Sequence, residues 1–272
     1  MRKGALGGLA VLSAAGWLLE TAVLAPRRFR VTEVPLAVPG WPADLDGLRV
    51  ALVGDLHVGA PWVDLPRLRA VVDAVVAAKP DLVLLLGDHV ADVHFGKQVE
   101  PAALARELAG VLRAGVPVLG VLGNHDWWAG GWRIRAALEE AGLPVLEEAA
   151  VPVLGGRLWV AGVGDLWERS PSVAAALAHA PADAPVLLMT HNPDVIADVP
   201  PSVQLVVAGH THAGQVLVGG RPMHRLSERS GNRWLGGWYA GARLYVTAGV
   251  GSSLIPLRSV TPEVPVLVLR PA

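Results

Sequence analysis

Short apolar runs alternate along this chain with segments of helical periodicity. The runs with the length and residue types of buried β-strands are 48–53, 82–86, 116–122, 186–189, 203–208, 244–247 and 264–269. Shorter strands are expected around 145–154 and 158–163. Asp64 and Pro66 begin a helical pattern that ends before Lys79 and Pro80. Further helices are predicted over about 99–113 and 132–141.

This order of elements predicts an α/β fold. Strands that alternate with helices favour a layered arrangement, and the strand-rich second half indicates a second, mixed sheet packed on the first. Residues 31–47 are rich in proline and glycine, which predicts an extended lead-in. We therefore expect three segments: an N-terminal helix with its basic flank over 1–30, the lead-in over 31–47, and a single domain over 48–272.

The N-terminal segment 5–25 is apolar and has basic residues on both sides. It is about as long as the roughly 20 residues that cross a bilayer. Glu20 opposes a deep position in the membrane, because a carboxylate there costs several kcal/mol. We expect a membrane anchor, and a cleaved signal peptide or a peripheral helix stay open as alternatives.

The composition excludes several classes of partner and site. Lys and Arg number 23 against 24 Asp and Glu, a net charge of −1, so no general attraction to nucleic acid is expected. The chain has no cysteine, which excludes disulfides, zinc–thiolate sites and a cysteine nucleophile. Any metal must be held by His, Asp, Asn or Glu.

Polar clusters follow the predicted strands directly. They are Asp55-x-His57, Asp88, Asn124-His125-Asp126, His191 and His210-x-His212. Because open α/β sheets bind ligands beyond the carboxyl ends of their strands, these clusters are expected to converge. Their oxygen and imidazole donors suit Zn, Mn or Fe. A single catalytic zinc takes about three protein ligands, so this larger set fits two metals better, an arrangement suited to phosphoryl transfer to water.

The motifs GDLH, GD, GNHD, the histidine of THNPD, and GHTH resemble in order and approximate spacing those of the calcineurin-like metallophosphoesterase superfamily. The resemblance covers about 48–258, including 249–253 and 256–258. With its N-terminal segment and GHTHAGQ block, the chain looks most like the bacterial membrane-associated phosphodiesterase branch, near proteins that hydrolyse UDP-diacylglucosamine. It implies a four-layer α-β-β-α sandwich of two mixed sheets, and a location at the cytoplasmic membrane.

The resemblance also implies roles for the polar residues. One metal is bound by Asp55, His57 and His212, the other by Asn124, His191 and His210, and Asp88 bridges them. His125 is expected to act on the leaving-group oxygen as a general acid or as a stabilising charge, with Asp126 orienting its other ring nitrogen. A hydroxide activated by both metals, which are Mn, Zn or Fe, is the implied nucleophile.

The expected function is hydrolysis of a phosphoester by a phosphodiesterase or pyrophosphatase, with lipid-linked or UDP-linked substrates favoured by the N-terminal segment. A nucleotide phosphodiesterase or phosphomonoesterase is the alternative, followed by a scaffold that keeps the fold without catalysis. Trp127, Trp128 and Trp132 follow GNHD, and Trp234 lies among arginines. The sequence leaves open whether these rings contact substrate or pack under the N-terminal helix.

Overall fold

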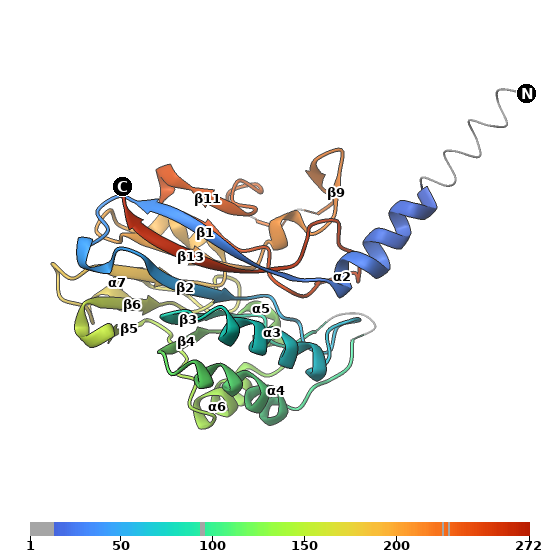
Figure 1. Ribbon diagram of the computed structural model, residues 1–272, viewed down its shortest axis with the longest axis horizontal. Coiled ribbons are helices and arrows are strands. Elements are labelled where there is room, and N and C mark those ends of the chain that lie inside the picture. Colours follow the sequence, from blue (N-terminus) through green and yellow to red (C-terminus); the bar gives the residue numbers. More distant parts are fainter. Residues whose placement is uncertain (1–13, 93–95, 225, 228) are drawn as a thin grey trace, which may run out of the picture.

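Two mixed β-sheets form the centre of the molecule (Figure 1). The computed structural model describes residues 14–92, 96–224, 226–227 and 229–272. In the first sheet the strands lie in the order β1 (Arg30–Val38), β13 (Glu263–Pro271), β2 (Leu48–Val53), β3 (Leu82–Leu86) and β4 (Val118–Val121). Strands β2, β3 and β4 are parallel, and β13 is antiparallel to β2.

The second sheet contains the later strands. Their order is β11 (Gly237–Tyr239), β12 (Leu244–Val246), β8 (Leu205–Ala208), β7 (Val186–Met189), β6 (Leu158–Gly162) and β5 (Ala149–Val153). The four inner strands are parallel and both edge strands are antiparallel, so this sheet is mixed as well. A separate short hairpin pairs β9 (Leu217–Val218) with β10 (Arg221–Pro222).

Three apolar layers join these sheets to each other and to the helices. The first sheet packs its outer face on α3 (Leu65–Ala77), α4 (Pro101–Leu108) and α6 (Gly131–Glu140), which gather on one side of Figure 1. Side chains such as Leu84 and Leu187 fill the space between the sheets. The outer face of the second sheet packs on α7 (Val173–Leu177) and the turn η5 (Pro193–Asp198). The predicted arrangement of two mixed sheets with outer helical layers is therefore present, although its last layer is thin.

The predicted helix ends are close to those observed. Asp64 caps α3 by accepting a hydrogen bond from the backbone N–H of Arg67 at 2.9 Å. The helix predicted over 99–113 divides into α4 and the tighter turn η3 (Ala109–Ala114), which ends at Gly115 with a positive φ. The remaining helical pieces are α5 (Asn124–Trp128), η2 (Ala43–Leu45), η4 (Leu154–Gly156), η6 (His212–Gly214) and η7 (Ala240–Ala242).

The N-terminal part departs from the expected arrangement. The lead-in predicted over 31–47 includes β1, which pairs with β13 along its whole length and forms an edge of the first sheet. Residues 14–27 are helical, with a π-helical stretch over Glu20–Leu24 and α2 at Ala25–Arg27, and this helix projects from the end of the molecule opposite the C-terminus. Residues 1–13 of the expected anchor lie outside the described residues. Within the described part of the chain, no helix is long and apolar enough to cross a bilayer.

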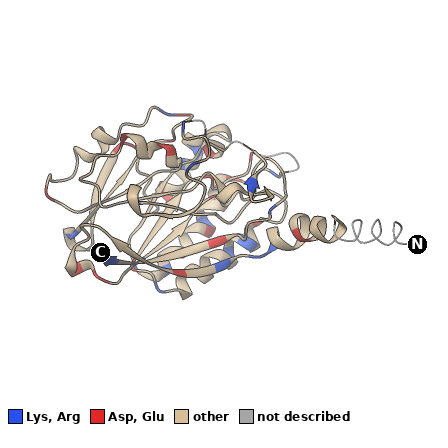
Figure 2. Cartoon of the chain, turned by 90° about the horizontal axis from the view of Figure 1, so that it is seen from above, with Lys and Arg blue, Asp and Glu red and all other residues tan. Residues whose placement is uncertain are grey.

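Acidic and basic residues are interspersed along the ribbon (Figure 2), in keeping with the balanced composition. Both sheets direct the carboxyl ends of their parallel strands toward one region. Asp55, Asp88 and Asn124 follow β2, β3 and β4, and His191 and His210 follow β7 and β8. The two faces of the sandwich thus contribute to one site.

Candidate metal centre

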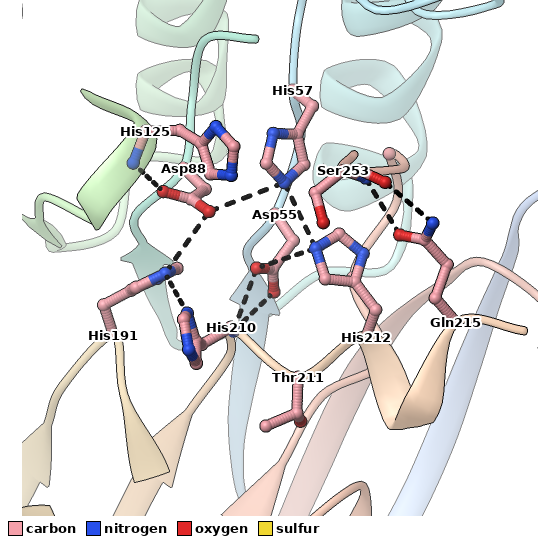
Figure 3. Close-up of polar contacts among 12 residues, drawn as sticks. Asp55, His57, Asp88, His125, His191, His210, Thr211, His212, Gln215 and Ser253 are labelled. Carbon is pink, nitrogen blue, oxygen red and sulfur yellow. Dashed lines mark hydrogen bonds and ion pairs between the residues drawn. The ribbon is translucent and has the colours of Figure 1, made fainter. Parts of the chain in front are cut away.

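The seven predicted donors and His125 lie in one buried cluster beyond the strand ends (Figure 3). None of them is more than 7% exposed. Their donor atoms form overlapping groups in which Asp88 recurs. We call Asp55, His57 and His212 the first group, and Asn124, His191 and His210 the second group. Asp88 lies between the two groups.

The three donor atoms of the second group and one oxygen of Asp88 lie close together. His191 Nε2 lies 3.3 Å from Asp88 Oδ2, 3.2 Å from Asn124 Oδ1 and 3.2 Å from His210 Nδ1. His210 Nδ1 is also 3.1 Å from Asn124 Oδ1. Atoms bound at about 2.1 Å to one metal are about 3.0–3.4 Å apart at octahedral to tetrahedral angles. These spacings therefore fit a bound cation.

The hydrogen bonding of His191 supports the same interpretation. Its Nδ1 lies 2.8 Å from the carbonyl oxygen of Leu86, which can only accept, so Nδ1 carries a proton. In the neutral ring, Nε2 then presents a lone pair toward Asp88, Asn124 and His210. A backbone carbonyl that fixes the ring in this way is a common support for a metal-binding histidine.

The first group is arranged around Asp55 and two histidine rings. His57 Nε2 and His212 Nε2 are 3.1 Å apart, and His212 Nε2 lies 3.5 Å from Asp55 Oδ1. His57 Nε2 is also 3.5 Å from Asp88 Oδ2, the oxygen that faces His191. A single carboxylate oxygen therefore faces donors of both groups.

The backbone at the strand ends is shaped for these contacts. Five of the residues have a positive φ between 47° and 73°, namely Asp55, His57, Asp88, His210 and His212. This conformation costs a residue with a Cβ atom about 1 kcal/mol or more. Gly209 matters for a different reason, because a Cβ atom there would overlap the Asp55 carboxylate. The His210 N–H donates to Asp55 Oδ1 at 2.9 Å, which closes this part of the site.

Burial and mutual charge shift the ionisation of the cluster. Burial, with the Asp88 charge adding to it, raises the pKa of Asp55 to about 7. Burial lowers the pKa of His57 and of His210 to about 3 each. For His191 the effect of burial is outweighed by Asp88, which raises the pKa of His191 to about 10. Burial opposes the charge on Asp88, but His191, His57 and His125 hold its pKa well below the usual range. Binding of a metal here would therefore displace the proton that His191 carries beside Asp88.

His125 lies in the cluster and belongs to neither of the two groups, although it forms a further candidate set with His57 and Asp88. Its ring is edge-on to His57, with ring centroids 4.8 Å apart, and to Trp128 at 4.7 Å. Its backbone N–H donates to Asp88 Oδ1 at 2.9 Å. Among the described residues, His125 Nδ1 is buried and has no hydrogen-bond partner.

The role predicted for Asp126 is therefore wrong. Its carboxylate accepts from the backbone N–H groups of Gly123 at 3.0 Å, His89 at 2.8 Å and Val90 at 3.1 Å, and it does not reach His125. Adjacent residues on a helix point in different directions, so Asp126 folds back to cap the start of α5 while His125 faces the site. Asp126 instead fixes the loop that follows Asp88.

The family model for calcineurin-like phosphoesterase matches residues 48–214, more than half of the chain. The chain belongs to this family. It is 29% identical over 250 residues to a "Transmembrane protein with metallophosphoesterase domain" of Danio rerio, covering 84% of this chain and 54% of the relative. An uncharacterized metallophosphoesterase of Helicobacter pylori is 30% identical over 246 residues, covering 87% and 62%. One of Aquifex aeolicus is 28% identical over 266 residues, covering 96% and 97%.

The chain thus spans 54% and 62% of the lengths of the first two relatives. Beside the family match, the structure provides candidate groups of metal ligands. The bacterial membrane-associated branch and the likeness to UDP-diacylglucosamine hydrolases are not established by these matches.

Several side chains around the candidate site had no role in the sequence interpretation. Arg258 is fully buried, and its Nη1 lies 3.2 Å from His212 Nδ1. Its guanidinium also donates to the carbonyls of Ala248, Gly249, Gly251 and Val260. Trp167 packs edge-on against His210 with ring centroids 4.5 Å apart. His89 turns away from the metal cluster, since its Nε2 lies 3.2 Å from the carbonyl of Val121.

Proposed function

We propose that this protein is a two-metal phosphoester hydrolase, acting as a phosphodiesterase or pyrophosphatase. The observation that carries the proposal is the Asp88 oxygen that faces His57 of the first group and His191 of the second. The first group would hold one metal, the second group the other, and Asp88 would contact both. When bound, the two metals supply Lewis acidity that activates a water molecule and stabilises charge on the phosphoester oxygens.

The protein's own residues provide the remaining chemistry. His125 lies beside His57 and Asp88, with which it forms a third candidate set of metal ligands. We propose that the first and second groups hold the metals and that His125 donates a proton to the leaving-group oxygen or stabilises its charge. Trp128 packs against its ring and limits its motion. Two hydrogen bonds join the loop after β3 to the start of α5: His89 N–H donates to Asp126, and His125 N–H donates to Asp88.

The proposed substrate is lipid-linked or UDP-linked, and the proposed location is the cytoplasmic membrane. Support comes from exposed apolar side chains on the N-terminal helix and on Trp62, which contacts it: Trp17, Leu18, Leu19 and Trp62. Trp62 donates to the Ala22 carbonyl, and Arg27 lies over the Trp62 ring at 3.8 Å. Aromatic and basic side chains of this kind are typical of membrane interfaces. The name of the Danio rerio relative agrees with this proposal.

The test of the reaction is hydrolysis of bis(p-nitrophenyl) phosphate by purified protein supplied with Mn or Zn. We expect metal-dependent turnover that His125→Ala greatly reduces. Turnover of p-nitrophenyl phosphate in place of the diester would favour the alternative phosphomonoesterase. Metal binding without any turnover would favour a scaffold. A panel of UDP-linked lipids, glycerophosphodiesters and cyclic nucleotides then separates the substrate classes.

A further inference from the structure

A hollow lies beside Trp167, whose ring packs on His210 of the second group. It has a volume of about 440 Å³ and is lined by Leu166, Trp167, Asp194 and Arg229. The Trp167 ring contacts His210, and Asp194 lies three residues after His191, so this hollow begins next to the second group.

A larger cleft of about 570 Å³ continues from it. Asp194 and Arg229 line both spaces, so the two meet there. The far part of the cleft is formed by Arg233, Trp234 and Arg243. We call the larger space the arginine cleft.

Within the part of the chain that the structure describes, one of the three cleft arginines has an ion-pair partner. Arg229 pairs with Asp198 at 3.1 Å. Arg233 lies over the Trp234 ring at 4.4 Å, and Arg243 donates to the Pro201 carbonyl at 2.5 Å. Among the described residues, neither Arg233 nor Arg243 has a carboxylate within ion-pair distance.

Asp194 lines both spaces and offsets part of the positive charge, while one of its oxygens also holds the loop. It is buried, and its Oδ2 accepts from Ser227 Oγ at 2.6 Å and from the Arg229 N–H at 3.0 Å. The described lining of the cleft thus has three arginines and one carboxylate, and Asp198 pairs with one of the arginines, so positive charge is in excess. Guanidinium groups arranged in this way recognise phosphate groups through paired, charge-assisted hydrogen bonds.

We propose that the arginine cleft binds a second phosphate of the same substrate whose scissile phosphoester lies at the metal centre. The inference rests on the proposed function for the position of the first phosphate. It restricts the substrate class to molecules that carry two phosphate groups, with Trp167 between the two positions.

Isothermal titration calorimetry with metal-loaded, full-length protein tests the binding of a second phosphate without any turnover. The probes are n-hexylphosphonate and a series of alkanediyl bisphosphonates with four, six and eight carbons, whose C–P bonds are not hydrolysed. We expect at least one bisphosphonate to bind about tenfold or more tightly than the monophosphonate, the usual effect of an added charge-assisted contact. Arg233→Gln and Arg243→Gln should each reduce that advantage.

The matched control is Arg157→Gln, because Arg157 lies in the segment between β5 and β6, beside Asp44, and lines neither space. It should retain the advantage. The proposal is overturned if no bisphosphonate exceeds the monophosphonate, or if the advantage survives in both Arg233→Gln and Arg243→Gln. If the wild type shows this bisphosphonate advantage but does not hydrolyse the chromogenic diester, the proposed reaction is wrong and the assignment of the cleft is still supported.

Discussion

The two ligand groups share Asp88 but differ in charge and surroundings. The first group has a carboxylate of its own, Asp55, and Arg258 closes it off behind His212. The second group has the neutral amide of Asn124 instead, and His210 lies against the half-exposed Trp167. A directly bound carboxylate attracts a cation more strongly than an amide does, and Arg258 acts from a greater distance. We infer that the first group holds its metal more tightly and that the second faces the substrate.

Replacement of the shared ligand should have the largest effect. Asp88→Asn removes the negative charge that both metals would contact in the proposed centre, so we expect the binding of both metals to be weakened and kcat/KM to fall by about three orders of magnitude or more. Hydrolysis of the chromogenic diester at saturating Mn gives the rate. A variant that keeps near wild-type activity would show that Asp88 does not join the two groups.

His125→Ala should lower the rate while leaving both groups intact. General acid–base catalysis contributes about 10²- to 10⁴-fold, and we expect a loss of kcat in that range. Metal content, measured by plasma mass spectrometry, should match the wild type because the His125 ring is not a ligand in this account. Loss of metal together with activity would instead make His125 part of the centre.

Chelator treatment of the wild-type protein should show a difference in metal affinity between the two groups. We expect the metal of the second group to leave first, with an apparent affinity about tenfold weaker, because its amide replaces a carboxylate. Titration with EDTA, followed by metal analysis after gel filtration, should show a plateau near one metal per chain. Release of both metals in a single step would show that the two groups do not differ in metal affinity.

Trp167→Phe should have the smallest effect. It trims the ring that packs on His210, so we expect KM for a diester to rise about two- to threefold with metal content unchanged. Trp132→Phe is the control, because Trp132 is more exposed and packs on Trp127. Equal effects of the two substitutions would indicate that Trp167 has no special relation to the second group.

The sequence predicted the strands and the polar clusters at their ends because both are local patterns. Apolar runs such as 82–86 specify buried strands, and their parallel pairing brings Asp55 and Asp88 to one edge. The contact between Arg258 and His212 joins residues 46 apart, and no spacing in the sequence indicates it. The wrong role for Asp126 has a local cause, since the capping geometry of α5 turns its carboxylate away from His125.

The proposed split of GHTH between the two metals is the central claim, and metal content tests it most directly. His210→Ala and His212→Ala, each reconstituted with Mn and analysed by mass spectrometry of the intact protein under native conditions, should bind about one metal per chain, against two in the wild type. The metal that remains in His212→Ala should be removed easily by chelator, because it occupies the weaker second group. The metal that remains in His210→Ala should resist chelator, because it occupies the tighter first group. One metal in the wild type, or loss of the same metal from both variants, would contradict the account.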